Sequence, residues 1–254
     1  MYEDFKTLLA RREGPVVRIH FNNPDAGNAV DGTFLDEMTT VLDAVADDPG
    51  VRVVVLSGAG DDFCLGGDRR EFADLAGRDP GGTGIRTLGV KARRVCDALA
   101  TSHAVTIARL HGGVIGAGLG IALFCDLRVG ADTSRYRLPE LALGLPAVWG
   151  GALPRLLSEA GTARIRELIL TGDTFDAEAA AAISVLQKVV PESELDAVVT
   201  GWIKPVVRRS PAALRVTKAA LNAYAAGTRM ADATLLESDL LAAVVVAARH
   251  AERG

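Results

Sequence analysis

The sequence predicts an α/β protein with helices added at its C-terminal end. Strand-like apolar runs alternate with segments of helical spacing as far as about residue 190, and the pattern after Pro191 is helical. The run 51–58 is apolar almost throughout, as expected for a strand covered on both faces. Such alternation is typical of a parallel sheet with helices packed on it. With 254 residues, 49% of them hydrophobic, the chain is long enough for one large domain.

Most of the predicted strands lie in the first half of the chain. We expect a hairpin over residues 5–21, followed by a helix over 33–46 that Asp31 caps. Residues 74–84 are rich in Gly, Asp and Pro, and we expect them to form a mobile loop. Further strands are expected at 51–58, 105–110 and 126–130, with a helix at 85–100.

Helices are expected to dominate the second half. Residues 136–146 have no regular spacing and are expected to be irregular, and one last strand is expected at 186–190. The predicted helices are 152–158, 163–171, 176–183, 192–208, 211–226 and 230–252.

Composition and charge exclude several classes of protein. The net charge of -4 argues against a nucleic-acid-binding surface, and three widely spaced cysteines form neither a disulfide framework nor a zinc pattern. The chain does not open with a signal-peptide pattern, and the apolar run 240–248 is too short to span a bilayer. We therefore expect a cytoplasmic protein that does not enter a membrane.

Two glycine-rich turns follow predicted strands. The longer one, 111–120, comes after the strand 105–110 and leads into an apolar segment, and the shorter one is 63–68. A small-residue turn at a helix start presents free backbone N–H groups, which can hold a phosphate, a carboxylate or an oxyanion. Small residues also let a helix pack closely on a sheet, so the turns alone leave both interpretations open.

Four separated segments together resemble the enoyl-CoA hydratase/isomerase (crotonase) superfamily. Residues 22–30 resemble its N-x-P-x-x-x-N-A-[LV] stretch, and residues 63–68 resemble its F-[SC]-x-G-[AG]-D segment. Residues 111–126 resemble its glycine-rich helix start that ends in Cys-Asp, and residues 138–144 resemble its P-E-x-x-L-G turn. With two weaker matches further on, the resemblance covers about residues 10–222.

The resemblance implies a spiral of ββα units followed by helices that build trimers and often hexamers. On this basis we expect an α/β core with the acyl-CoA site over 1–195 and a helical oligomerisation region over 196–254. The implied substrate is an acyl-CoA thioester. No cofactor is implied besides the coenzyme A that the substrate carries, and no metal site is implied.

In that family two backbone N–H groups hold the thioester oxygen and stabilise an enolate. Carried over by position, the donors are Gly67 and Ala117, and Glu140 matches the acid/base glutamate of the P-E turn. Arg69 and Arg70 are expected contacts for the phosphates of coenzyme A. The residues expected to bind substrate are Ala26, Asn28, Leu65, Gly66, Asp68, Gly113, Gly116, Pro139 and Leu143. Asp68 is also expected to cap the next helix.

The sequence departs from the family at its second acid/base position. Hydratases of the family use two glutamates, and the position of the other one is occupied here by Gly120, which cannot exchange a proton. Losing one acid/base group costs factors of about 10² to 10⁴ in rate. Other branches place an aspartate eight residues beyond the P-E glutamate, and here that residue is Val148.

The favoured hypothesis is therefore a double-bond isomerase in which Glu140 alone moves a proton. An enoyl-CoA hydratase that works with one glutamate is the first alternative. A carbon–carbon bond-forming or -breaking enzyme and a non-catalytic acyl-CoA-binding subunit also stay open. A catalytic Glu140 requires a pKa raised by burial among apolar residues. Tyr136 and Trp149 either line the acyl pocket or pack in the core.

Overall fold

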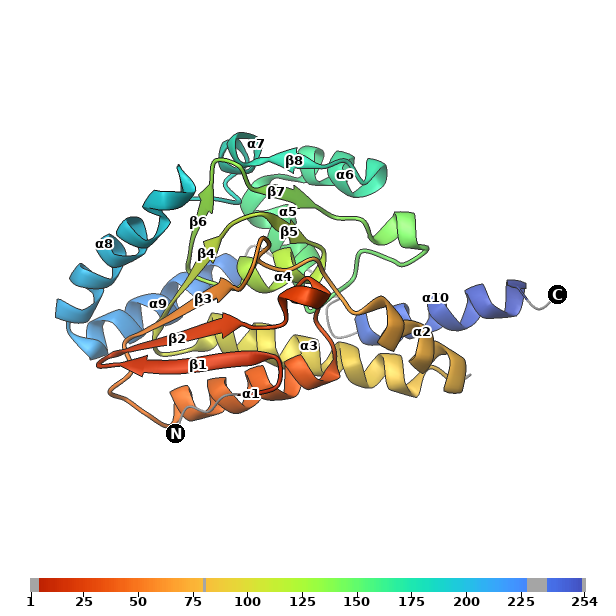
Figure 1. Cartoon of the computed structure of the whole chain (residues 1–254), viewed down its shortest axis with the longest axis horizontal. Coiled ribbons are helices and arrows are strands. Elements are labelled where there is room, and N and C mark those ends of the chain that lie inside the picture. The colour runs from red at the N-terminus through yellow and green to blue at the C-terminus, as the bar shows by residue number, and fades with distance from the viewer. Residues whose placement is uncertain (1–4, 80, 228–236, 253–254) are drawn as a thin grey trace.

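The computed structural model describes residues 5–79, 81–227 and 237–252. Strands and helices alternate from the N-terminus to the last strand, and the elements beyond it are helical (Figure 1). No helix in this described part of the chain is long and apolar enough to cross a membrane.

The main sheet is parallel except at one edge. Its order is β1-β2-β3-β4-β6-β9, and only the first pair, β1 and β2, is antiparallel. The strands are β1 (Leu8–Glu13), β2 (Val16–Phe21), β3 (Val53–Gly58), β4 (Val105–Leu110), β6 (Leu127–Ala131) and β9 (Lys188–Val190).

A second, smaller layer of strand pairing runs beside the main sheet. It contains β5 (Gly113–Ile115), β7 (Arg135–Arg137) and β8 (Phe175–Asp176), together with two isolated parallel bridges, Val30–Gly67 and Cys64–Val114. Each of β2, β3, β4 and β6 is thus followed by a short extended segment that pairs with the next turn of the chain. This is the expected spiral of ββα units, and the second layer is the part that sequence periodicity missed because its segments are too short to show any.

The helices cover both faces of the main sheet. Alternate residues of β3 enter different cores, since Val54 and Leu56 belong to the main cluster, which contains α1 and α3 residues, whereas Val53 and Val55 pack with α8. This two-sided burial explains the continuous apolar run. The helices are α1 (Gly32–Ala46), α2 (Arg69–Arg78), α3 (Thr83–Thr101), α4 (Ala117–Leu123), α5 (Ala152–Ala160), α6 (Thr162–Thr171), α7 (Ala177–Ala182), α8 (Leu195–Arg208), α9 (Pro211–Gly227) and α10 (Glu237–Glu252), with 3₁₀ turns η1 (Pro24–Ala26), η2 (Glu140–Leu143) and η3 (Glu192–Glu194).

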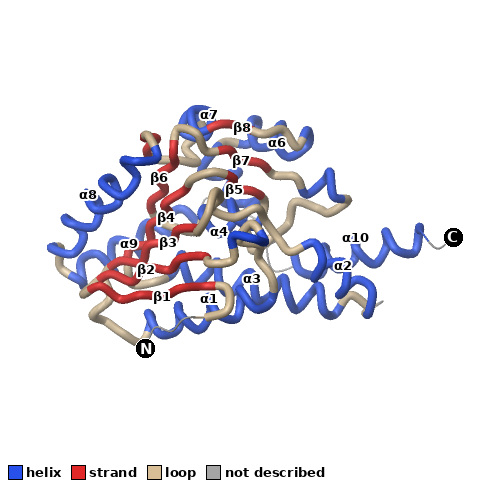
Figure 2. The backbone as a smooth tube through the Cα atoms, in the orientation of Figure 1, coloured by secondary structure: helices blue, strands red, loops and turns tan. Residues whose placement is uncertain are grey.

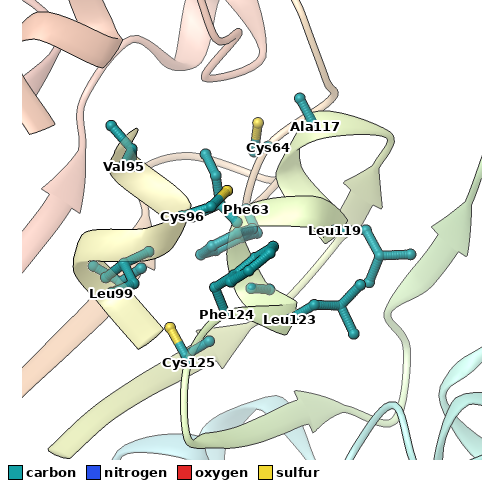
Figure 3. Packing of buried hydrophobic residues seen from close by; sticks show 14 of the residues in the cluster. Phe63, Cys64, Val95, Cys96, Leu99, Ala117, Leu119, Leu123, Phe124 and Cys125 are labelled. Atoms are coloured by element: carbon teal, nitrogen blue, oxygen red, sulfur yellow. The ribbon is translucent and has the colours of Figure 1, made fainter. Parts of the chain in front are cut away.

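The main core meets the glycine-rich turns around α4. Figure 3 shows Cys96 and Leu99 of α3 gathered with Phe63, Phe124 and other apolar side chains from the segments around them. All seven residues of α4 are buried. The small residues of the 111–120 stretch therefore serve close packing as well as the turn itself.

Most predicted elements are confirmed, and one is wrong. The hairpin, the helix capped by Asp31 and the central strands lie where they were expected, and the Asp31 side chain accepts a 2.7 Å hydrogen bond from Phe34 N. The predicted loop at 74–84 is wrong for its first part, because α2 continues to Arg78. Two features stabilise this helix: the Asp68 side chain caps its start, and its apolar side chains pack in a hydrophobic cluster. The high content of Gly, Asp and Pro did not indicate it.

The last two helices, α9 and α10, attach to the core at different places. The Lys218 ammonium of α9 is 2.7 Å from the Asp126 carboxylate and donates to Ala104 O at 2.9 Å. Helix α10 packs along α3, as Figure 2 also shows. Residues 230–236 of the predicted last helix lie outside the described residues, and the division at residues 195 and 196 stays a prediction.

Candidate active site

A largely apolar cavity of about 520 Å³ lies at the start of α4 and reaches the inward sides of α2 and α10. Among the described residues, its only charged side chains are those of Asp68, Arg69 and Glu140. The predicted site residues that line it are Leu65, Gly66, Gly67, Asp68, Gly116, Ala117, Pro139, Glu140 and Leu143.

The two predicted N–H donors occupy equivalent places in successive turns of the spiral. Gly67 follows Cys64 by three residues and Ala117 follows Val114 by three, and Cys64 pairs with Val114. Val30 N donates to Gly66 O and Asp68 N donates to Val30 O, so the Gly67 N–H faces away from Val30. It has no acceptor among the described residues. Ala117 is the first residue of α4, and the N–H of a first helical residue has no partner within the helix.

Glycines allow the two turns to approach each other. Gly66 has a φ of 106° and Gly116 a φ of 48°, values that side chains disfavour. A Cβ atom on Gly66 would lie 3.4 Å from Ile115 O. Side chains at these positions would therefore add strain and bulk where the two donor turns meet the cavity.

Glu140 comes from the third turn of the spiral, just after β7. Its carboxylate lies beside Gly116, since a Cβ atom on that glycine would be 3.3 Å from Glu140 Oε1. Oε2 is buried and has no hydrogen-bond partner among the described residues. Burial raises the pKa of Glu140, and a hydrogen bond from its own backbone N–H opposes the shift. A carboxylate with one unpartnered oxygen and a raised pKa beside an apolar cavity is suited to accept a proton from carbon.

The indole of Trp149 lies against the position of the missing second carboxylate. A Cβ atom on Gly120 would lie 2.8 Å from Cε3 and 3.0 Å from Cζ3 of Trp149. Real Cβ atoms do not approach ring atoms so closely, so a side chain at position 120 requires the indole to shift. Of the two expected alternatives, Trp149 lines the cavity. Tyr136 packs in the core, where it is fully buried, hydrogen-bonds to Ser134 and stacks on Phe175.

Three predicted substrate contacts, Ala26, Asn28 and Gly113, do not line the cavity. The Asn28 side chain is buried and donates to Ala59 O and Asp62 O, each at 2.9 Å. Gly113 N donates to an Asp62 carboxylate oxygen at 2.6 Å. Asn28 and Gly113 thus hold the segment that leads into Gly67. This support of the turn accounts for their match to the family motifs.

Sequence reasoning missed the contribution of α2 and α10 to the cavity. Phe72, Leu241 and Val245 line it, and the signal available for them was only their helical spacing. The Cys64 thiol next to the donor turn is fully buried, and burial raises its pKa to about 12, so it stays protonated. No cluster of His, Cys, Asp and Glu able to hold a metal ion occurs among the described residues.

Comparison with known proteins places this site in a family. The sequence model of the family described as enoyl-CoA hydratase/isomerase matches residues 11–252. The short-chain-enoyl-CoA hydratase of Clostridium acetobutylicum is 30% identical over 220 residues, which cover 86% of this chain and 82% of that protein. The chain therefore belongs to the enoyl-CoA hydratase/isomerase family and is an enzyme of that family, with its crotonase-like fold.

Two further similarities cover most of the chain. The peroxisomal Delta(3,5)-Delta(2,4)-dienoyl-CoA isomerase of Arabidopsis thaliana is 30% identical over 230 residues, which cover 86% of this chain and 82% of that protein. A crystal structure from Thermobifida fusca YX, in complex with CoA, superposes with a TM-score of 0.79 at 30% identity and covers 97% of this chain and 95% of that one.

The buried carboxylate of Glu140 generates a prediction about stability and pH. We expect Glu140→Gln to raise the free energy of unfolding at pH 8 and to have little effect at pH 4. The folded-state pKa lies above the unfolded value of about 4.3, so the folded state binds more protons between the two values and its stability falls as the pH rises through them. Urea denaturation of both proteins from pH 4 to pH 8 measures this. If the two proteins differed in free energy of unfolding by the same amount at pH 4 and at pH 8, burial of the Glu140 carboxylate would not be the cause of the difference.

The contact between Gly120 and Trp149 generates a second prediction. We expect Gly120→Ala to lower the free energy of unfolding by about 1–3 kcal/mol through overpacking. In a Trp149→Ala background the same change should become neutral or stabilising, by up to about 1 kcal/mol, because alanine favours a helix over glycine. Urea denaturation of the unchanged protein, the two single variants and the double variant gives the coupling free energy between positions 120 and 149.

The control for this cycle is Gly201→Ala in α8. A Cβ atom at Gly201 would meet nothing within 4 Å, so this change should stabilise in both backgrounds. Identical effects of Gly120→Ala with and without Trp149 would show that the indole does not close the position.

Proposed function

We propose that the protein isomerises enoyl-CoA thioesters with Glu140 as its single acid/base group. The observation that carries the proposal is the Glu140 carboxylate, whose Oε2 is buried and without a partner among the described residues, beside the turn that ends at Ala117 and with the Trp149 indole against position 120. The similarity to a structure in complex with CoA supports an acyl-CoA substrate. The reaction requires no cofactor besides the coenzyme A of the substrate.

In the proposed mechanism one proton moves and no atom is gained. The Glu140 carboxylate removes a proton from the α-carbon of a 3-enoyl-CoA, and the electron pair passes to the thioester oxygen. The N–H groups of Gly67 and Ala117 donate to that oxygen and stabilise the negative charge that develops there. Glu140 then returns the proton to the γ-carbon, and the double bond moves to the 2,3 position.

A hydratase is the second candidate, and the name of the Clostridium relative favours it. Hydration needs a water positioned at the β-carbon and a proton donor for the α-carbon. In this cavity Glu140 would have to serve both steps, since Asp68 caps α2 by accepting from Arg70 N and Glu71 N. The isomerase proposal requires only one proton carrier and therefore suits the residues better.

We propose in addition that the chain assembles as a trimer or a hexamer. The outward side of α9 supports this, because Val216 and Leu221 are each 65% exposed and Tyr224 is 81% exposed. Such a concentration of exposed apolar side chains on one helix is typical of a surface that another chain covers.

The reaction is tested by product analysis with matched 3-enoyl-CoA and 2-enoyl-CoA. We expect the 3-enoyl substrate to become the 2-enoyl product with no added water mass, by mass spectrometry and chromatography. Glu140→Gln should lower kcat by about 10² to 10⁴ while acyl-CoA binding persists, because the thioester contacts stay in place.

The exposed Glu192→Gln serves as the matched control and should leave kcat unchanged. Rapid gain of water by 2-enoyl-CoA, with no isomerisation, would replace the proposal with the hydratase. Turnover that is unaffected by Glu140→Gln would remove Glu140 from either mechanism.

A further inference from the structure

Most of the cavity lining carries no charge. The charged lining side chains among the described residues are Asp68, Arg69 and Glu140, and Arg69 is exposed at the start of α2. Apolar side chains of α2, α10 and the segment 145–149 contribute much of the remaining lining. An acyl group that extends from a thioester at the donor turns into this apolar part of the cavity would meet α10.

Helix α10 contributes two side chains, one turn apart, to the apolar part of the lining. Leu241 is 5% exposed and Val245 is 8% exposed, and both line the cavity. They pack in a small cluster with Ile85, which is fully buried, and with partly buried Phe72, Leu75, Ala76, Leu145 and Val148. A polar group on the acyl chain that packs against these side chains would lose water to apolar contacts.

The placement of α10 is fixed by contacts that are independent of any substrate. The Glu237 carboxylate is buried and accepts a 2.6 Å hydrogen bond from Gly151 N. A Cβ atom on Gly89 of α3 would lie 2.7 Å from Ser238 Oγ, so the two helices meet at a position that only glycine allows. Asp239 also pairs with Arg86 of α3. These contacts hold Leu241 and Val245 against the cavity.

We propose that Leu241 and Val245 determine the acyl specificity of the enzyme, which accepts unsubstituted aliphatic acyl groups of medium length. This inference rests on the proposed function and adds the substrate class. The cavity of about 520 Å³ accommodates an acyl group of roughly six to ten carbons with part of the thioester arm. A terminal carboxylate at the same length is disfavoured because it would be desolvated against the apolar side chains of this lining.

The experiment measures kcat/KM for a series of 3-enoyl-CoA substrates from four to fourteen carbons, with binding of the matching saturated acyl-CoAs by calorimetry. We expect kcat/KM to rise by about fourfold for each methylene that the cavity accepts, to pass through an optimum, and then to fall. A terminal carboxylate at the optimal length should lower kcat/KM by about 100-fold or more.

Variants of α10 should move this optimum. Leu241→Phe should shift it to shorter chains, and Leu241→Ala or Val245→Ala should shift it to longer ones. The matched controls are Leu240→Ala and Val244→Ala on the same helix, where the side chains are 48% and 38% exposed. These should leave the profile unchanged. Thermal unfolding of every variant shows whether α10 still packs on α3, and Leu241→Phe keeps the test valid if the alanine variants unfold.

The outcomes separate this inference from the proposed function. A best substrate of four carbons, or equal shifts from Leu240→Ala and Leu241→Ala, would overturn the role of α10 while isomerisation itself persists. Absence of isomerisation at every chain length, with saturated acyl-CoA affinity still peaking at medium length and still moving with Leu241, would overturn the isomerase and keep the acyl specificity.

Discussion

The lateral pairing of successive turns of the spiral is the constraint on which the site depends. Cys64 pairs with Val114, and Val114 pairs with Tyr136, so three consecutive turns are held in one register. Three residues further along each turn lie Gly67, Ala117 and Pro139, and Glu140 follows directly. The two N–H donors and the carboxylate are therefore brought together by short backbone pairings in segments that are distant in sequence. A shift of this register would separate the donors from the carboxylate.

Much of this arrangement could be predicted from the sequence, because its parts have strong local signals. The apolar run of β3 and the glycine-rich turns identified the strands and the turns that follow them. Gly67, Ala117 and Glu140 were found through the resemblance to a family. The proposed chemistry of Gly67 and Ala117 resides in backbone N–H groups that no composition reveals, and nothing in its immediate sequence separates Glu140 from other loop carboxylates. The short strands β5 and β7, which set their register, have too few residues to show periodicity.

Other parts could not be predicted because they depend on contacts between distant segments. Nothing in the sequence near Gly120 indicates that Trp149 occupies the space beside it, where a side chain at position 120 would begin. In the same way, Asn28 matches a family motif, but its amide supports the 59–62 backbone. Leu241 and Val245 belong to the region 196–254, for which the resemblance implied oligomerisation, whereas the structure places their buried side chains in the lining of the cavity.

A crystal structure of the complex with a non-reactive acyl-CoA thioester tests the central claim most directly. The account predicts that the thioester oxygen lies about 2.7–3.1 Å from both Gly67 N and Ala117 N. It also predicts that the α-carbon lies within about 3.5 Å of the Glu140 carboxylate. A thioester bound elsewhere in the cavity, or one that contacts neither N–H group, would contradict the claim that the paired turns of the spiral form the catalytic site.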